Sequence, residues 1–513
     1  MKERNTIFAK VKRWSIMQAK VLFCIFVVIS MISGKTADNI FLLKGYVKDD
    51  TGHGIAGVVV NNGVNFAVTD KHGAWTLLTD TTVSKFVSIS TPKEFQLPQT
   101  DGLASGFYKP VAEAVAHRGS SEFVLTRRET VSDAFHYIAI SDPQILNAHD
   151  LKRWRNETVA DIMRTAASLH KTGEVVGMTL GDLVFDNMPM YEQYAASLRN
   201  KRMTIFQCIG NHDFNKAYAD LHRQAPDAEE WAEKMYGKYF GPVNYSFNIG
   251  KTHIVTMKNI NYEGRCKYEE EITEADMEWL RRDLSHVPKD VVVILNMHAP
   301  AWNNMEKIDN ILNADRLAEV LSTHETHVFC GHTHFFENVE VTPRLYQHNI
   351  AAACGAWWTS TLNRDGAPNG YMIVDVQGRD LKWHYKGANH NADYTMRVYK
   401  PGEFASQQGY VVANVWDWDK HCRVVWYEDG KYKGQMQQFT DNDADFLLTR
   451  PQKHQLCKTQ HLFRAKPTSK AYRTIKVVML NRFGDTSTYT IVNRNNRPFL
   501  LDDNKTAATR RKK

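Results

Sequence analysis

Cysteine, long apolar runs and low-complexity sequence are scarce in this chain of 513 residues. It contains seven cysteines and no Cys-x-x-Cys pair, which excludes a disulfide-stapled scaffold, a zinc knuckle and a dithiol redox motif. Cys208 and Cys330 lie inside apolar strand-like runs, where cysteine acts as a small hydrophobic residue, so we expect both in the core. No residue class dominates the composition, which excludes collagen-like, coiled-coil and fully disordered chains.

A concentrated basic patch is also absent from the body of the chain, although the formal net charge is +7. The surplus lies at the two ends, because six basic side chains fall within residues 1–20 and residues 510–513 are Arg-Arg-Lys-Lys. A nucleic-acid-binding face needs clustered Lys and Arg to displace counterions from phosphates. We therefore expect no nucleic acid among the partners, and a basic disordered tail over residues 503–513.

One apolar run, residues 21–32, follows the basic N-terminus. A charged segment, a short apolar run and the small residues Ser33 and Gly34 are typical of a secretory signal peptide. The run is shorter than the roughly 20 residues that span a bilayer, so residues 1–36 are predicted to be cleaved; an uncleaved membrane anchor is the alternative. The protein is then periplasmic or secreted, with no transmembrane span after signal removal.

The region from residue 38 to 128 consists of short alternating runs separated by turns such as Asn61-Asn62-Gly63, which predicts an N-terminal β-sandwich. Its Gly-Val-x-Val strand at 57–60 and its Thr-Asp-x-x-Gly-x-Trp strand at 69–75 resemble the carboxypeptidase-regulatory or transthyretin-like module. Such modules serve as spacers or docking domains, so we assign this region no chemistry.

Alternation returns from residue 370 to 502 and predicts a C-terminal β-rich domain. Trp416, Trp418 and Trp426 are grouped in it. Aromatic residues in alternating strands belong to the core more often than to a sugar-stacking platform, so we expect these three to be buried.

Strands alternate with helices in the middle region, residues 132–362, which predicts an α/β layered domain. Thr273 and Asp276 form a capping-box pattern in front of one of its helices. The predicted strands cover residues 137–140, 175–180, 204–209, 253–257, 291–295 and 327–330, and the predicted helices cover 151–170, 190–198, 274–284 and 314–321.

Metal-ligand side chains follow five of these apolar strands. In α/β folds the ends of adjacent strands open onto one crevice, so ligands far apart in the sequence meet there. The five segments are Ser141-Asp142-Pro143-Gln144, Gly181-Asp182, Gly210-Asn211-His212-Asp213, Asn296-Met297-His298 and Gly331-His332-Thr333-His334.

These residue types suit a site for two metal ions. The two oxygens of Asp182 can bridge two cations. His332 and His334 lie two residues apart, so in an extended segment each imidazole can bind a different ion. Glycine before Asp182, Asn211 and His332 lets the backbone approach the ions closely. Two ions about 3.5–4 Å apart lower the pKa of a bridging water and stabilise the oxygens of a phosphoryl group during its in-line displacement.

The order of these motifs, above all Gly-Asn-His-Asp followed by Gly-His-x-His, resembles the calcineurin-like metallophosphoesterase family over about residues 135–359. The three-part layout resembles a secreted bacterial subgroup of that family. The resemblance implies a β-sandwich flanked by helices. It also implies one metal held by Asp142, Gln144, Asp182 and His334, and a second held by Asp182, Asn211, His298 and His332.

The resemblance further implies that His212 stands beside the phosphate as leaving-group acid or transition-state donor, oriented by Asp213, and that metal-bound hydroxide is the nucleophile. The chain departs from the family at Gln144, where histidine is usual. An amide oxygen is a harder and weaker ligand than imidazole, which favours Mn²⁺, then Mg²⁺, with Fe or Zn²⁺ as alternatives.

We therefore predict a metal-dependent phosphoric ester hydrolase that acts on a phosphate mono- or diester of a small molecule, lipid or sugar. Two other functions stay open: an inactive glycan- or protein-binding surface module, and a metal hydrolase of a non-phosphate ester. Asp186 could line the substrate pocket or cap a helix, and Trp302, Trp357 and Trp358 could stack on a substrate or pack in the core. The sequence predicts neither the substrate nor the oligomeric state.

Overall fold

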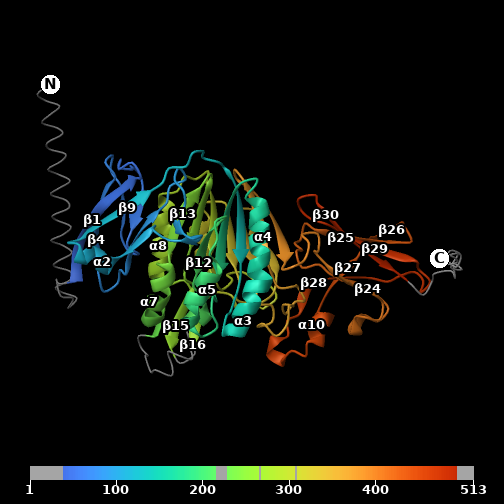
Figure 1. Cartoon of the computed structure of the whole chain (residues 1–513). Helices are drawn as coiled ribbons and strands as arrows, with labels where there is room; N and C mark the ends of the chain where they lie inside the picture. Colours follow the sequence, from blue (N-terminus) through green and yellow to red (C-terminus); the bar gives the residue numbers. More distant parts are fainter. Residues whose placement is uncertain (1–38, 215–227, 265–266, 307–308, 494–513) are drawn as a thin grey trace, which may run out of the picture. The chain divides into compact units, whose positions relative to one another are not determined.

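The computed structural model describes residues 39–214, 228–264, 267–306 and 309–493 (Figure 1). They form two compact units, one from the described residues up to Thr91 with Gly106–Arg128, the other from Pro92–Ser105 and the described residues from Glu129 onward. The predicted signal peptide (1–36) and basic tail (503–513) lie outside the described residues. Within the described ranges, no helix has the length and apolarity needed to cross a membrane.

The first unit is built from two small sheets and one short helix, as the alternating sequence predicted. Along its longest strand Leu43, Gly45 and Val47 are buried while their neighbours are not, which is the two-residue period of a sheet with one covered face. The strand orders are β4-β1-β9 and β3-β2-β5-β8. The elements are β1 (Ile40–Asp49), β2 (Val59–Asn61), β3 (Phe66–Val68), β4 (Ala74–Asp80), β5 (Phe86–Ser90), β8 (Tyr108–Pro110), α2 (Val111–Ala116) and β9 (Ser120–Leu125).

The segment Pro92–Ser105 belongs to the second unit. It forms β6 (Gln99–Thr100) and β7 (Leu103–Ala104), and β7 extends a large sheet by pairing with β12 (Thr204–Cys208). The prediction of an N-terminal sandwich over 38–128 did not include the pairing of this segment with the second unit, because strands of two residues show no hydrophobic periodicity.

Two large sheets form the centre of the second unit. One has the order β22-β21-β10-β11-β12-β7-β6, and the other has the order β13-β14-β17-β18-β20-β19. Their remaining strands are β10 (Ala134–Ile140), β11 (Glu174–Leu180), β21 (Gly370–Gln377), β22 (Asp380–Gly387), β13 (Tyr245–Ile249), β14 (Thr252–Thr256), β17 (Val292–Asn296), β18 (Thr326–Cys330), β19 (Glu337–Thr342) and β20 (Leu345–Asn349).

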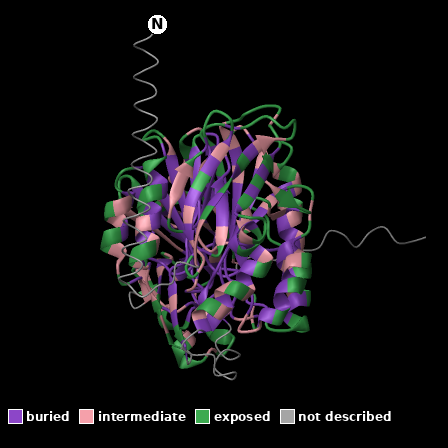
Figure 2. Ribbon diagram, turned by 90° about the vertical axis from the view of Figure 1, so that its left-hand side faces the viewer, coloured by how far each residue is buried: buried purple, intermediate pink, exposed green. Residues whose placement is uncertain are grey.

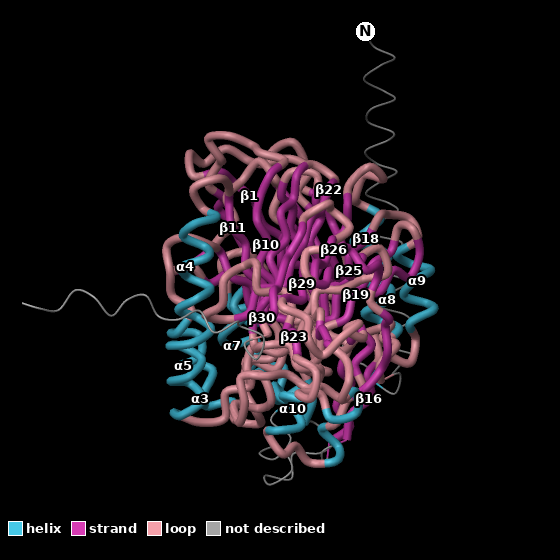
Figure 3. Tube along the Cα trace, turned by 90° about the vertical axis from the view of Figure 1, so that its right-hand side faces the viewer, coloured by secondary structure: helices cyan, strands magenta, loops and turns pink. Residues whose placement is uncertain are grey.

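The two sheets pack face to face through aromatic side chains. The ring of Phe206 on β12 stacks on Phe247 of β13 at 4.1 Å, and Tyr137 on β10 contacts Phe329 of β18 at 5.4 Å. Helices cover the outer faces: α3 (Ala148–Arg153), α4 (Ala160–Leu169) and α5 (Tyr191–Ser197) lie on one side, and α8 (Glu274–Ser285) and α9 (Ala314–Leu321) lie on the other (Figure 3). The strands are mostly buried, whereas the outward faces of the helices are exposed (Figure 2). This is the predicted sandwich flanked by helices.

The predicted helices are present with one change in geometry. Residues predicted as one helix over 151–170 form α3 and α4 joined by a π-helical turn at Trp154–Val159. The predicted cap is confirmed, because Thr273 Oγ1 accepts a hydrogen bond from the backbone N–H of Asp276 at 3.1 Å. The helices are α3 (Ala148–Arg153), α4 (Ala160–Leu169), α5 (Tyr191–Ser197), α7 (Ala228–Phe240), α8 (Glu274–Ser285) and α9 (Ala314–Leu321).

Two strands within the predicted C-terminal region, residues 370–502, pair with the first large sheet. β21 pairs antiparallel with β10 and β22 pairs with β21, so both complete the edge of the first large sheet. The domain proper is two four-stranded sheets, ordered β23-β24-β28-β27 and β26-β25-β29-β30. Its elements are β23 (Arg397–Tyr399), β24 (Val411–Asn414), β25 (Arg423–Glu428), β26 (Lys431–Gln435), β27 (Gln437–Asp441), α10 (Ala444–Leu448), β28 (Thr459–Ala465), β29 (Thr474–Leu480) and β30 (Thr486–Val492).

The predicted core residues are mostly buried. Trp416 and Trp426 are buried and Trp418 is partly buried; Trp426 and Trp418 lie in the C-terminal core cluster. Cys208 and Cys330 are fully buried, and both are free thiols. These residues therefore contribute packing, as the sequence predicted.

Candidate metal centre

The polar segments meet where five parallel strands end. Asp142, Asp182 and Asn211 follow strands of the first large sheet, and His298 and His332 follow β17 and β18 of the second. The backbone N–H of His332 donates to Asp142 Oδ2 at 3.0 Å, and His298 Nε2 lies 3.3 Å from Asp182 Oδ1. Ligand atoms of the buried residues Asp142, Asp182 and His298 all lie within 4.8 Å of one another. The two sheets thus build one site between them.

His298 and His332 each use one ring nitrogen to hold the ring and turn the other toward Asn211. His298 Nδ1 donates to the Leu180 carbonyl at 2.8 Å, and His332 Nε2 lies 3.5 Å from Glu270 Oε1. The opposite nitrogens lie 2.8 and 2.9 Å from Asn211 Oδ1 and 3.2 Å from each other. Ligand atoms about 2.1 Å from one ion lie roughly 3.0–3.4 Å apart, so this arrangement fits a cation.

A second cluster contains Asp142 and His334. The buried Oδ1 atom of Asp142 has no hydrogen-bond partner among the described residues and lies 3.6 Å from His334 Nε2. The other nitrogen, His334 Nδ1, donates to the Gly355 carbonyl at 2.9 Å. Because an unsatisfied buried carboxylate oxygen is costly, the chemistry of this donor set also fits a cation.

Gln144 lies at the same cluster but presents its amide nitrogen to it. Gln144 Nε2 donates to Asp182 Oδ2 at 2.9 Å, and Cys354 Sγ lies 3.8 Å from Gln144 Oε1. To act as the predicted ligand, the side chain must turn its amide by half a rotation, which places the oxygen where the nitrogen now lies.

The electrostatics of the site favour positive charge. Burial by itself lowers the pKa of His298, but the carboxylate of Asp182 outweighs burial and raises this pKa to about 9. Burial raises the pKa of Asp182, and the facing imidazoles outweigh it and hold this pKa well below its usual range. Both shifts arise because two buried carboxylates favour positive charge at this site, which protonated His298 supplies here and a metal cation would supply when bound.

The backbone is left-handed at five of the seven predicted ligands, all except Asn211 and His298. Such conformations cost free energy in residues other than glycine and gather at functional sites. The positive φ angles are 49° at Asp142, 46° at Gln144, 52° at Asp182, 72° at His332 and 54° at His334.

The glycines have the predicted role. A Cβ on Gly210 would lie 2.3 Å from the backbone nitrogen of Asp182, and one on Gly331 would lie 2.5 Å from Asp142 Oδ2. Gly181 has a φ of 91°. Only glycine lets these three loops pass so close to the ligand side chains.

The expectation that Asp213 orients His212 is corrected by the structure. His212 Nδ1 lies 3.0 Å from Asp186 Oδ1, and the His212 ring stacks on Phe185 with centroids 4.0 Å apart. Asp186 therefore lines the site, which resolves the choice between pocket and helix cap.

Asp213 instead ties two loops of the site together. Its buried carboxylate accepts hydrogen bonds from the backbone N–H groups of Leu183 and Gly210, at 3.0 and 2.9 Å. Burial, with the nearby Asp182 carboxylate, raises the pKa of Asp213 to about 8. The sequence indicated an acidic residue beside His212 but could not indicate which one faces the ring.

Asn in place of Asp186 is expected to lower kcat for phosphate esters by roughly 10–100-fold, the usual cost of losing an orienting partner. Asp186→Asn keeps the shape of the side chain but removes the carboxylate that faces His212 Nδ1. Steady-state kinetics with p-nitrophenyl phosphate checks this, with Asp375→Asn as control, since Asp375 pairs with His136 on β10. Equal effects of the two substitutions would contradict the assignment.

Glu270 is a site residue that sequence reasoning missed, whereas Trp357, for which substrate stacking and core packing were both open, also lies at the site. Glu270, at the end of β16 (Lys267–Glu270) in a hairpin with β15 (Ile260–Gly264), faces His332, and the ring of Trp357 stacks on His334 at 4.6 Å. Burial raises the pKa of Glu270, but its contact with His332 outweighs this and lowers it. Glu270 stands in a run of three glutamates, so nothing in the sequence distinguishes it.

The fold and the clustered ligands define a metal-dependent hydrolase domain, and family models identify it. A model described as calcineurin-like phosphoesterase matches residues 135–336. Models for the N terminal and the C terminal of calcineurin-like phosphoesterase match residues 42–128 and 347–487. The chain belongs to the calcineurin-like phosphoesterase family, with both accessory domains, and is a metal-dependent phosphoester hydrolase.

Solved structures are similar over about half of the chain. A dimetal phosphatase from Danio rerio is 11% identical, covers 49% of this chain and 96% of its own, and has a TM-score of 0.35. A 5'-nucleotidase from Candida albicans is 11% identical over 50% of this chain and 52% of its own, with a TM-score of 0.32. A metallophosphoesterase from Sphaerobacter thermophilus is 14% identical over 50% and 89%, with a TM-score of 0.23. No curated protein matches the chain.

Proposed function

We propose that the protein hydrolyses phosphate mono- or diesters at a site for two divalent cations. Asp142, Gln144, Asp182 and His334 would hold one ion, and Asp182, Asn211, His298 and His332 the other. The observation that carries the proposal is the convergence of His298 Nε2 and His332 Nδ1 on Asn211 Oδ1, beside Asp142 Oδ1, to which no atom in the described part of the chain donates a hydrogen bond. When bound, such ions supply a water of lowered pKa as nucleophile and neutralise charge on the phosphoryl oxygens.

His212 would act on the leaving group or on the phosphoryl oxygens. Asp186 engages Nδ1 of the ring, so Nε2 is the nitrogen that remains to donate a hydrogen bond to substrate. Phe185 holds the plane of the ring, and the backbone N–H of His212 donates to Asp182 Oδ1 at 2.8 Å. His212 is therefore fixed both to the Asp182 carboxylate, which would contact both ions, and to the carboxylate of Asp186.

Mn²⁺ or Mg²⁺ is the proposed metal. The donor set contains two carboxylates and two amide groups beside three imidazoles, and oxygen-rich sets favour these harder ions. We also propose that the protein acts outside the cytoplasm, which is supported by the basic and then apolar sequence of residues 1–32. N-terminal sequencing of the exported protein checks the predicted cleavage.

Hydrolysis of p-nitrophenyl phosphate and bis-p-nitrophenyl phosphate tests the proposal, with Mn²⁺ or with chelator. Asn211→Ala and His332→Ala are expected to lower turnover by more than about 100-fold, which exceeds the loss from a supporting group. His149→Ala, at a side chain 71% exposed, is the control and should match the wild type.

Metal-independent turnover would refute the two-ion site. Absence of both turnover and bound metal would favour the binding-module alternative, and turnover of carboxylic but not phosphate esters would favour the other alternative. The preferred model ester then indicates whether monoesters or diesters are the natural class.

A further inference from the structure

The buried side chain of Arg364 joins three parts of the second unit. Arg364 Nη1 donates to the Thr333 carbonyl at 3.0 Å, and the Arg364 backbone N–H donates to the His334 carbonyl at 3.0 Å. Its guanidinium forms two hydrogen bonds to Glu306, of 2.7 and 2.6 Å, and its Nε donates to the Gln455 carbonyl at 3.1 Å. One residue thus contacts the Gly-His-x-His turn, the loop after His298 and the C-terminal domain.

The next residue anchors the same turn deeper in the C-terminal domain. Asp365 Oδ2 accepts hydrogen bonds from the backbone N–H of Phe336 at 2.7 Å and from His461 Nε2 at 3.0 Å. On β28, His461 in turn pairs through Nδ1 with Asn414 Oδ1 of β24 at 2.6 Å. Asp365 and His461 are buried, so water does not compete for these contacts.

We propose that Arg364 is a positioning residue through which the C-terminal domain sets the place of His334 and of the loop that carries Glu306. This rests on the proposed function, in which His334 is a metal ligand. A guanidinium is planar and rigid. Its two hydrogen bonds to Glu306 and its hydrogen bond to the Thr333 carbonyl therefore fix the distance between the loop that carries Glu306 and the Gly-His-x-His turn. The C-terminal domain is then a working part of the metal centre.

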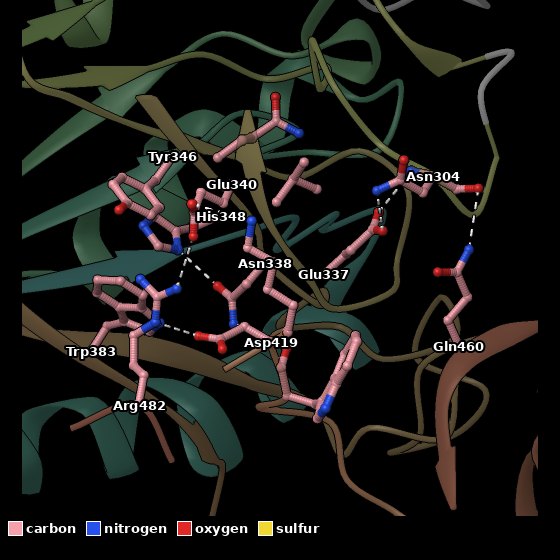
Figure 4. A pocket seen from close by; sticks show the side chains of 14 residues that line it. Asn304, Glu337, Asn338, Glu340, Tyr346, His348, Trp383, Asp419, Gln460 and Arg482 are labelled. Carbon is pink, nitrogen blue, oxygen red and sulfur yellow. Dashed lines mark hydrogen bonds and ion pairs between the residues drawn. The ribbon is translucent and has the colours of Figure 1, made fainter. Parts of the chain in front are cut away.

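A second anchor between the same domains provides the control. Arg482 forms ion pairs with Asp419 at 2.7 Å and Glu340 at 3.3 Å, and its guanidinium lies over the rings of Trp383 and Tyr346 (Figure 4). These contacts surround a pocket of about 200 Å³ and involve none of the seven proposed ligands. Loss of Arg482 therefore tests the stability of the domain contact without touching the Gly-His-x-His turn.

Mn²⁺ titration of the metal-free, full-length protein by calorimetry separates the two roles. Arg364→Met is expected to weaken binding at one of two sites by about 10–100-fold, as loss of groups that hold ligands does. Arg364→Lys keeps the charge without the planar guanidinium, so we expect an intermediate loss. Arg482→Met should lower the Tm while leaving Mn²⁺ affinity within about twofold of the wild type.

The inference is overturned if Arg364→Met, or Arg364→Lys where the Met variant does not fold, binds two Mn²⁺ ions with wild-type affinity. It is also overturned if Arg482→Met weakens Mn²⁺ binding as much as the Arg364 variants do. Failure of the proposed function looks different, because the wild-type protein itself would then bind no Mn²⁺ or hydrolyse no phosphate ester.

Discussion

Asparagine in place of Asp182 is expected to lower kcat/KM for model phosphate esters by about 10³-fold or more. Asp182 belongs to both proposed ligand sets, so Asp182→Asn removes a charge that both ions share. Losing several kcal/mol of charge stabilisation corresponds to about 10³-fold, at 1.36 kcal/mol for each factor of ten. Kinetics and elemental analysis of bound metal measure the effect.

The amide of Asp182→Asn has nearly the shape of the carboxylate, so the fold should persist. Asp283→Asn is a matched control. Asp283 is also a buried carboxylate, but it lies on α8 and contacts Ser246 and His253. This control should change the Tm and keep both metal content and turnover. Turnover by Asp182→Asn within tenfold of the wild type would show that the cluster is not the reaction centre.

Alanine in place of Gly210 is expected to destabilise the metal centre as a whole. The added Cβ would lie 2.3 Å from Asp182 N and 2.4 Å from Asp182 Oδ1, where only backbone movement can relieve the clash. Overpacking of this kind costs about 1–3 kcal/mol, and here it also displaces the bridging carboxylate. Gly210→Ala should therefore lower the Tm by several degrees and reduce both metal content and turnover.

Gly409→Ala is the matched control for that substitution, since a Cβ there would meet no atom within 4 Å. We expect it to leave the Tm within a degree or two and the metal content unchanged. A Gly210→Ala protein that is as stable and as active as Gly409→Ala would contradict the packing argument.

The strands and most of the ligand segments could be predicted from the sequence because each combines two signals. A run such as that before Asp182 is apolar over six residues, which marks a buried parallel strand, and it ends in glycine and a ligand. The carboxyl ends of adjacent parallel strands lie at the same edge of a sheet. The convergence of Asp142, Asp182 and Asn211 could therefore be predicted from the topology.

Contacts between segments without a local signal could not be predicted. Residues 371–376 alternate as the C-terminal strands do, and only the pairing of β21 with β10 assigns them to the first large sheet. Asp213 adjoins His212 in the sequence, whereas Asp186 precedes it by 26 residues, so nothing in the spacing indicates that Asp186 is the carboxylate that faces the ring. Glu270 reaches His332 from the β15–β16 hairpin, which is distant in the sequence, so the spacing of residues along the chain does not indicate this contact.

The left-handed backbone at the ligands limits which sequences this centre can explore. Asp, Asn and His tolerate such conformations better than other residues with side chains, whereas β-branched residues are strongly disfavoured there. In a mutational library at Asp142, Asp182, His332 and His334, only variants with Asp, Asn or His would therefore test how the side chain affects metal binding. Variants with other residues at these positions would be lost because of backbone strain, whether or not their side chains could bind a metal ion.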